Sequence, residues 1–543
     1  MSSPPPVRQR PGPDPWGPLD RLLGAAEALA GAWGARARAS TTVGQERAIL
    51  RLFGVHGLDA AGGPLAGTAV NRWLAGEPHA LGSGIALPFA MALLEYDLEP
   101  QQLARDVASG AVDLALEAAL LREPDRRAVA EQEAGRLAAA AIERIDAERT
   151  VRHETMAVLG DAPRPWLGAT LRQPDEDVAL EEAAALVAAG LDLIRIEVPI
   201  GRELAGRLSA AGLDVPEWRP REGARGAATR EQADPAPIGS QRALAELRAA
   251  VDRAAAERRS YVRLATVLPA LGAPEGAVVA AFERIDLMGS DAVAEIVADA
   301  VEPDRALADH AFAHRLARRA GTLILVGPGP LVVAPDLSAG LPSDPATRAG
   351  RALALQLIGV VLARGDGLPT EQIVIDPLPP WLTDEPEPAA RAIAEVMVRR
   401  ALFPRHPFGF VEPPAGLAGA GLWPYLQAAA AVHAGDVALV LGRLDPDAED
   451  YVTAARGLRA SSMVAREVAA ATLPGTLTGS ALEHARSIVS AAVATLDRLA
   501  DHGWRTVAGD PPGGARAGSR GLDTIAERTE PFDPFESSLG PRG

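Results

Sequence analysis

The residues of this sequence best suited to chemistry are carboxylates, an arginine and a threonine at the ends of short apolar runs. They are Glu197, Arg263, Thr266, Asp286, Asp291, Asp376 and Glu412. If the runs are parallel strands, their carboxyl ends converge on one mouth or edge, where catalytic groups gather. Carboxylates near an arginine could hold the ammonium and carboxylate of an amino acid, or the ring and phosphate of a pyridine cofactor. The alternative is that Glu283, Arg284 and Asp286 form structural ion pairs between strands and helices.

Other catalytic chemistries are excluded by missing residue types. The chain has no cysteine, so it has no disulfide, thiolate zinc site, iron–sulfur cluster or cysteine nucleophile. It has no lysine either, and therefore no P-loop lysine and no lysine amine for a Schiff base. His310 and His314 have a metal-chelating spacing beside Asp309, but the glutamate of an HExxH motif is missing. We interpret this segment as a solvated helix face and predict no metal site.

The elements that must position these residues alternate between strand-like and helical patterns. The candidate strands are Trp166–Leu171, Leu191–Ile200, Tyr261–Leu268, Glu283–Gly289, Thr322–Gly329, Glu371–Pro377, Phe408–Pro414 and Asp436–Gly442. Ala-rich helical stretches lie between them. Strand–helix alternation of this length predicts an α/β fold, a (β/α)₈ TIM-type barrel, with a doubly wound sheet as the alternative architecture.

Composition divides the rest of the chain into flanking regions. We predict a disordered tail at 1–17, a helical N-terminal domain at 18–157, the barrel at 158–445, and a helical C-terminal extension with a tail at 446–543. A long polar loop from Glu217 to Ser240 follows the second strand and would lie on the barrel rim. Phe532 and Phe535 in the C-terminal tail could wrap the domain or a partner.

The charge balance narrows the partners and the compartment. A formal net charge of −17 repels phosphate backbones and anionic lipid, so we expect no nucleic-acid partner and no membrane association. No charge-free apolar stretch of about 18 residues is apparent, and the N-terminus lacks the apolar core of a signal peptide. Together with the absence of cysteine, this predicts a cytoplasmic protein.

Several segments resemble one enzyme family and follow its order along the chain. They are Thr41–Gly57, Gly160–Trp166, Ala280–Ile296, Leu402–Pro414 and the terminal RGLDTI…FDPFESSL. Together they resemble the α-subunit of the D-lysine 5,6-aminomutase family, whose members are radical enzymes dependent on adenosylcobalamin and pyridoxal 5'-phosphate.

The resemblance implies a two-subunit enzyme that shifts an amino group between adjacent carbons of lysine or a related amino acid. In the family, the α-subunit barrel binds pyridoxal phosphate at its mouth. A smaller Rossmann-type β-subunit carries the cobalamin and supplies the Schiff-base lysine. A chain without lysine and without a DxHxxG cobalamin signature is consistent with the α-subunit role.

The resemblance also implies roles for individual residues. Arg263, Glu283, Arg284, Asp286 and Asp291 occupy positions that the family retains. The residues assigned to catalysis are Asp291 and Arg263. Those assigned to cofactor binding are Arg263, Thr266, Asp286 and Ser240. Those assigned to substrate binding are Glu197, Asp376 and Glu412.

Departures from the family pattern keep other functions open. Val198 stands at or near a family arginine, and Ala415 and Gly416 replace a Thr-Lys pair. Much of the family's polar pocket is thus small or apolar here. The second hypothesis is a divergent non-catalytic homologue acting as a binding or assembly module. A third is a different barrel enzyme, such as a lyase, using Glu197, Asp376 and Glu412.

Overall fold

The computed structural model defines most of the chain between residues 17 and 539. The described residues are 17–59, 64–76, 78–171, 176–196, 241–268, 272–290, 292–298, 302–327, 344–379, 381–382, 386–412, 423–445, 448–472, 479–504 and 525–539.

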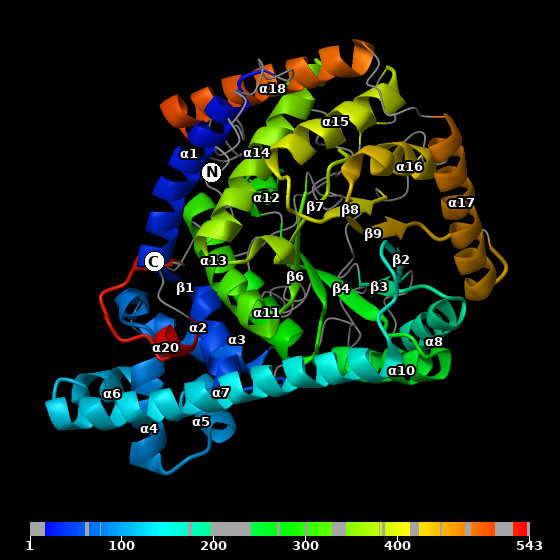
Figure 1. Cartoon of the computed structure of the whole chain (residues 1–543). Coiled ribbons are helices and arrows are strands. Elements are labelled where there is room, and N and C mark those ends of the chain that lie inside the picture. Colours follow the sequence, from blue (N-terminus) through cyan, green and yellow to red (C-terminus); the bar gives the residue numbers. More distant parts are fainter. Residues whose placement is uncertain are drawn as a thin grey trace, which may run out of the picture.

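Eight parallel strands close into a barrel at the centre of the molecule (Figure 1). They are β2 (Trp166–Thr170), β3 (Leu193–Arg195), β4 (Arg263–Leu268), β5 (Leu287–Ser290), β6 (Leu323–Val326), β7 (Ile373–Ile375), β8 (Phe408–Val411) and β9 (Val437–Gly442). The last strand pairs with the first, Trp166 opposite Leu439, which closes the cylinder. The predicted TIM-type barrel is therefore confirmed, and the doubly wound sheet was the wrong alternative, because an open sheet would leave β2 and β9 unpaired.

Side chains alternate along each strand between the barrel interior and the surrounding helices. Inward residues such as Trp166, Leu193, Ala265 and Val374 form one apolar cluster inside the barrel. Their strand neighbours belong to the larger cluster between strands and helices. The interior is so tight that a Cβ on Gly168 would stand 2.7 Å from the Leu193 carbonyl oxygen. Only glycine fits there.

Helices follow the strands and cover the outside of the barrel. They are α8 (Glu176–Ala188), α10 (Gln241–Arg258), α11 (Ala273–Phe282), α12 (Ala292–Ala298), α13 (Pro303–Ala320), α14 (Pro345–Gly365), α15 (Pro388–Leu402), α16 (Trp423–Ala434) and α17 (Tyr451–Thr472). Among the described residues, α14 is the one helix long and apolar enough to cross a membrane, and 67% of that stretch is buried. Packing within the fold therefore accounts for its apolar character.

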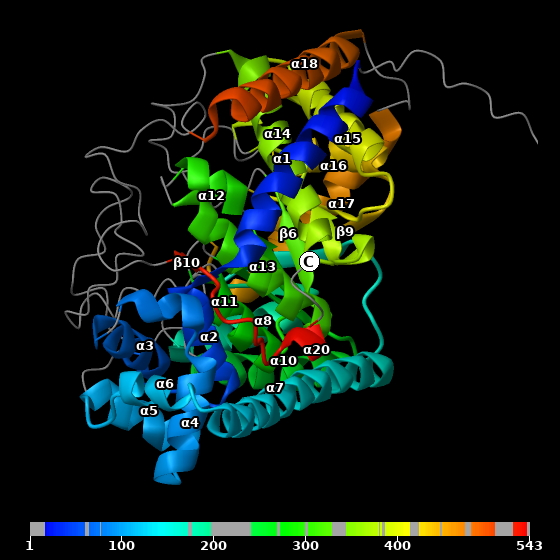
Figure 2. The same ribbon diagram turned by 90° about the vertical axis from the view of Figure 1, so that its left-hand side faces the viewer.

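Most of the N-terminal helices gather at the amino end of the barrel. They are α2 (Val43–Leu52), α3 (Leu65–Gly76), α4 (Ala86–Tyr96), α5 (Pro100–Ser109), α6 (Leu114–Leu120) and α7 (Pro124–Leu159), with a 3₁₀ turn η1 (Pro78–Ser83). The long α7 runs beneath the barrel in both views (Figures 1 and 2). From this helix, Arg152 donates to the Ala320 and Ile285 carbonyl oxygens and so ties α7 to the barrel.

The two ends of the chain meet on one side of the barrel. Helix α1 (Leu19–Ala39) packs against α13, α14 and α18 (Gly479–His502), away from the other N-terminal helices (Figure 2). Strand β1 (Ser40–Thr42) pairs antiparallel with β10 (Ile525–Glu527). Beyond β10, Phe535 is fully buried beside Phe53, just before the short α20 (Glu536–Leu539). The C-terminal segment thus packs against the same chain. The boundaries between the regions of the chain stay predictions.

Candidate active site at the barrel mouth

The carboxyl ends of the strands carry polar side chains directed into the barrel. Alternation continues inward from Gly168 to Thr170, from Leu193 to Arg195, and from Val374 to Asp376. It likewise continues from Leu441 to Arg443 beyond β9. We call Thr170, Arg195, Asp376 and Arg443 the mouth cluster, and we add Glu412, which follows the inward-facing Val411 of β8 and accepts a hydrogen bond from the Arg443 N–H. In TIM barrels this end of the cylinder is where chemistry occurs.

Arg195 is the most enclosed cation of the mouth cluster. It ends β3 directly opposite Thr170 of β2, and only 7% of the residue is exposed. A guanidinium held this far from solvent is suited to binding a carboxylate or phosphate through paired N–H donors.

Asp376 is held rigidly at the end of β7. Its backbone N–H donates to the Val326 carbonyl oxygen, which extends the parallel ladder by one residue. Its Oδ1 accepts the Leu378 N–H at 3.3 Å, and its side chain is buried. Gln356 of α14 donates to the carbonyl oxygens of both Asp376 and Val326, at 2.7 and 2.9 Å. These bonds fix the position from which the carboxylate meets a ligand.

Glu412 and Arg443 lie together at the ends of β8 and β9. The Arg443 N–H donates to Glu412 Oε2 at 2.9 Å. Burial raises the pKa of the Glu412 carboxyl, and this N–H and the Arg443 charge oppose the shift. The Nη1 of Arg443 is buried and meets no hydrogen-bond acceptor among the described residues. An anionic oxygen in the mouth would satisfy it.

The mouth cluster occupies one continuous arc of the barrel. Its strands follow the order β7, β8, β9, β2 and β3 around the closed cylinder. On the opposite arc, the inward positions near the ends of β4, β5 and β6 are Val267, Gly289 and Leu325. One wall of the described mouth is therefore charged and the other apolar. This arrangement suits a ligand with anionic and cationic groups on one side and a hydrocarbon or ring on the other.

Two of the predicted site residues lie at the opposite end of the barrel. Arg263 begins β4, about 16 Å from the strand's carboxyl end at ~3.3 Å per residue. Its Nη2 contacts Asp161 Oδ1 at 2.6 Å. Asp286 precedes β5 and pairs with Arg152 and Arg248, at 3.2 and 3.4 Å. The prediction that they line the mouth was wrong in position, because Arg263 is the first residue of β4 and Asp286 precedes β5, so both lie at the amino ends of their strands.

Thr266 also differs from its prediction. It neighbours the inward Ala265 on β4 and pairs with Met288, which belongs to the outer cluster. Its side chain therefore faces the surrounding helices and not the mouth. The remaining predicted residues, Glu197, Ser240 and Asp291, lie outside the described residues. Of the predicted set, the structure places Asp376 and Glu412 on neighbouring strands at the mouth.

The two helical histidines are buried, contrary to the solvated face predicted for them. Ser290 Oγ lies 2.7 Å from His310 Nδ1 and 3.0 Å from His314 Nε2. His314 Nδ1 lies 2.8 Å from Asp366 Oδ2. Within the part of the chain that the structure describes, no group of three or more His, Cys, Asp or Glu side chains is arranged to hold a metal ion. The cluster instead joins β5 to α13 and the end of α14.

Sequence reasoning missed Arg195 and Arg443, although each has a signal. In LDLIRIEVPI, Arg195 shares the alternating face of Leu191 and Leu193. Arg443 is the first charged residue after the apolar run DVALVLG. Inward-facing side chains recur at every second residue of a strand. Following that alternation two residues past Leu193 and Leu441 would have predicted both arginines at the mouth.

The chain matches one family model over most of its length. The model, described as "D-Lysine 5,6-aminomutase TIM-barrel domain of alpha subunit", covers residues 21–431.

Curated relatives carry a related name. "Lysine 5,6-aminomutase alpha subunit" of Acetoanaerobium sticklandii is 26% identical over 375 residues, which is 69% of this chain and 66% of the relative. The protein of the same name from Fusobacterium nucleatum is 26% identical over 382 residues, with the same coverage. The chain thus spans slightly less than two thirds of the length of these relatives.

Solved structures give a weaker likeness. A dihydropteroate synthase from Anaplasma phagocytophilum is 15% identical, covers 56% of this chain and 98% of its own, and has a TM-score of 0.33. A TM-score this low supports no inference about function.

Proposed function

Because the chain belongs to the family of the D-lysine 5,6-aminomutase α-subunit TIM-barrel domain, we propose that it is the barrel subunit of a radical aminomutase. Its reaction is the shift of an amino group between adjacent carbons of lysine or a related amino acid. The observation that carries the proposal is the charged mouth cluster at the carboxyl ends of β7, β8, β9, β2 and β3. A zwitterionic substrate needs both signs of charge at such a mouth.

The mouth cluster fits the anionic group of pyridoxal phosphate. Arg195 and Arg443 are the residues that would hold the phosphate, because a guanidinium matches phosphate with paired N–H donors. The buried Nη1 of Arg443 has no acceptor among the described residues, and a phosphate oxygen would supply one. When bound, the cofactor supplies a conjugated ring that carries the migrating amino nitrogen, while the partner's adenosylcobalamin supplies the radical.

The carboxylates are proposed to hold the substrate. Asp376, fixed by the Leu378 N–H and by Gln356, accepts hydrogen bonds from a substrate ammonium. Glu412 takes up a proton more readily than an exposed carboxyl, because burial raises its pKa. It can therefore hold a proton at Oε beside a substrate amine. The apolar wall of Val267, Gly289 and Leu325 receives the aliphatic chain.

A second subunit completes the proposed enzyme. The chain contains no lysine, so the Schiff-base lysine must come from another polypeptide. We propose a cobalamin-binding β-subunit of Rossmann type as that partner, and the cytoplasm as the site of the reaction. The roles predicted for Glu197, Ser240 and Asp291 remain part of this proposal.

The test combines the full chain with a cobalamin-binding subunit of the family, pyridoxal phosphate, adenosylcobalamin and D- or L-lysine. Mass spectrometry follows formation of the shifted diamino acid. Cofactor affinity is measured by fluorescence titration. Arg443→Gln and Arg195→Gln should each weaken cofactor binding by about 10- to 150-fold, the loss expected for a hydrogen bond to a charged group worth about 1.5–3 kcal/mol.

Arg21→Gln is the matched control, since Arg21 lies on the surface of α1 and pairs with Asp497 there. It should leave both measurements unchanged. Absence of product from every diamino acid tried, with wild-type chain and a competent partner, would refute the aminomutase assignment.

The second candidate is a non-catalytic binding or assembly module. The apolar arc at β4, β5 and β6 favours it, because the described inward positions there offer no side-chain functional group. Under this alternative, the chain still forms a complex with the cobalamin-binding subunit, but pyridoxal phosphate binds no more tightly to the complex than to the partner alone.

A further inference from the structure

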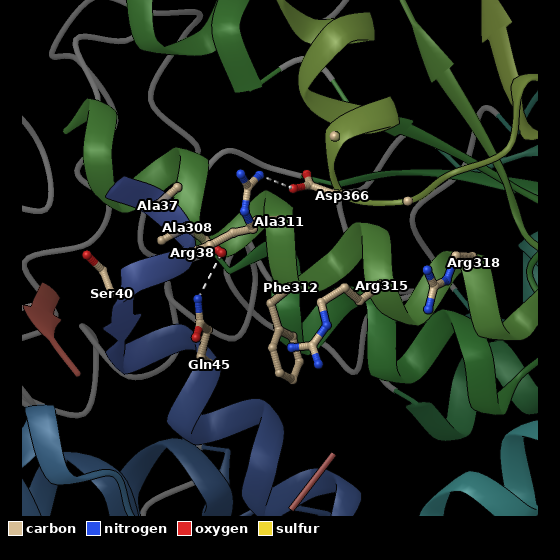
Figure 3. Close-up of a pocket in the computed structure, with 12 residues that line it drawn as sticks. Ala37, Arg38, Ser40, Gln45, Ala308, Ala311, Phe312, Arg315, Arg318 and Asp366 are labelled. Carbon is tan, nitrogen blue, oxygen red and sulfur yellow. Dashed lines mark hydrogen bonds and ion pairs between the residues drawn. The ribbon is translucent and has the colours of Figure 1, made fainter. Parts of the chain in front are cut away.

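A cavity lies between helices on the outside of the barrel (Figure 3). Its volume is about 200 Å³, and it opens between α1, the start of α2, α13 and the C-terminal end of α14. The side chains that matter for its chemistry are Arg38, Gln45, Arg315, Arg318 and Asp366.

The cavity carries more positive than negative charge. Among the described residues that line it, three are arginines and one, Asp366, carries a carboxylate. Asp533 adds a second carboxylate from outside the lining, 3.5 Å from Arg315. Arg318 donates instead to the Leu539 carbonyl oxygen, which carries no full charge. Counting these groups leaves one arginine charge in excess.

Arg38 is incompletely partnered. Its Nη1 is 3.5 Å from Asp366 Oδ1, a loose contact, and the Asp366 side chain is also bonded to His314. Arg38 Nε is buried and has no hydrogen-bond partner among the described residues. The side chain is 21% exposed, so a solute can reach it from the cavity.

Arg315 experiences the same excess of positive charge. Burial lowers its pKa, and the neighbouring Arg528 and Arg318 lower it further against the opposing effect of Asp533. An anion in the cavity would relieve this repulsion.

The size of the cavity limits the anion. About 200 Å³ corresponds to about seven water molecules at ~30 Å³ each. Sites for drug-sized ligands are larger, at about 300–1,000 Å³. Nucleotides are therefore too large, whereas a phosphate group with a few attached atoms fits. Paired N–H donors of arginine match phosphate better than a single-point cation would.

We propose that the cavity of Arg38, Arg315, Arg318 and Asp366 is a binding site for a phosphate dianion, either the free ion or a small phosphate monoester. The anion takes Arg38 away from Asp366. Asp366 then bonds to His314 alone, and His314 contacts Ser290 at the carboxyl end of β5. This inference does not depend on the aminomutase proposal.

The test measures binding of inorganic phosphate to the full chain by isothermal titration and thermal unfolding, with ionic strength held constant by chloride. Arg38→Gln should weaken phosphate binding at least tenfold. Asp366→Asn should strengthen it several-fold, because the competing negative charge is removed. Arg21→Gln is the control for non-specific charge and should bind as the wild type does. Glycerol phosphate and succinate are titrated in parallel.

Tighter binding of glycerol phosphate than of inorganic phosphate identifies a monoester as the ligand, and the reverse order identifies the free ion. Either order supports the proposal if the two variants move in opposite directions. Binding that does not saturate, succinate binding as tight as that of both phosphates, or equal affinities in Arg38→Gln, Asp366→Asn and the wild type would overturn it. Because no readout uses turnover, an inactive enzyme leaves the result intact.

Discussion

Arg263 lies over the ring of Trp166 at the amino end of the barrel, with its guanidinium carbon 3.5 Å from the centre of the indole ring. The same guanidinium contacts Asp161 at 2.6 Å. Trp166 in turn belongs to the apolar cluster inside the barrel. Arg263, which was predicted to be catalytic, therefore packs at the amino end of the barrel interior and has a structural role there.

Arg263→Gln should accordingly reduce stability and leave the mouth intact. Cation–π stacking contributes about 0.5–2 kcal/mol and a charge-assisted hydrogen bond about 1.5–3 kcal/mol, so we expect a loss of about 1–3 kcal/mol after partial compensation. Thermal unfolding measures the loss of stability. Titration of the cofactor in the presence of the partner subunit should show unchanged binding at the barrel mouth. If the variant has normal stability but no longer binds the cofactor, Arg263 belongs to the active site and the structural assignment is wrong.

Asp286→Asn should be more damaging. The Asp286 carboxylate faces Arg152 and Arg248 and accepts hydrogen bonds from the Tyr261 hydroxyl and the Leu264 N–H. Removing its charge leaves buried guanidiniums undercompensated, at a cost of about 3–5 kcal/mol. Chemical denaturation of the purified variant measures this loss in the free energy of unfolding.

Asp436→Asn is the matched control for that variant. Asp436 pairs with Arg164 at 3.3 Å, but the two side chains are 56% and 43% exposed. An exposed pair contributes at most about 1 kcal/mol. Similar losses in the two variants would contradict the assignment of Asp286 to the structural core.

His406 predicts a pH dependence of stability. Burial, followed by the charges of Arg364 and Arg400, lowers the pKa of His406 to about 4, from about 6.5 in an unfolded chain. The folded protein binds fewer protons at this group than the unfolded chain does. Its contribution to stability is therefore present above pH ~6.5 and is lost as the pH falls from ~6.5 towards 4.

His406→Phe should reduce that acid sensitivity, because a phenyl ring stays neutral and can keep the ring contact with Phe403. The measurement is the decrease in Tm between pH 7 and pH 5, compared with wild type. The exposed His153 supplies the control substitution, His153→Gln, which should retain the wild-type decrease. If His406→Phe and wild type lose the same Tm, the buried neutral imidazole is not a source of the acid sensitivity.

The strands were predictable because each is a short apolar run bounded by turn residues. Seven of the eight predicted runs contain a whole strand of the barrel, and the eighth, Glu283–Gly289, overlaps β5 (Leu287–Ser290). The ends of the strands were harder, since the run ERIDLMG gives no sign that pairing begins only at Leu287. Thr266 was assigned to the mouth from its place near the end of the strand alone, although neighbouring strand residues face opposite sides of the sheet.

Contacts between segments that are far apart along the chain could not be predicted from the sequence. Strands β1 and β10 are three residues each and come from opposite ends of the chain. Neither strand is long enough to show a recognisable alternation of apolar and polar residues. The cluster of Ser290, His310, His314 and Asp366 likewise depends on three elements meeting, and only the spacing of its two histidines was visible. Long-range hydrogen bonds of this kind are set by the packing of the whole domain.

Gly350 tests a close contact between two helices. It lies in α14, where a Cβ would stand 2.4 Å from Ala491 Cβ and 2.6 Å from the Ala492 backbone nitrogen of α18. Gly350→Ala must therefore push the two helices apart. Overpacking of this kind costs about 1–3 kcal/mol, more than the 0.5–1 kcal/mol that alanine gains over glycine inside a helix. We expect a lower Tm.

Gly24→Ala separates the two effects. Gly24 lies in α1, and a Cβ there meets nothing within 4 Å. Only the helix propensity changes, so this variant should gain about 0.5–1 kcal/mol and a higher Tm. Opposite signs for the two substitutions in thermal unfolding support the close approach of α14 and α18. A gain in both would mean that the helices are farther apart than described, because alanine at 350 is then accommodated without displacement.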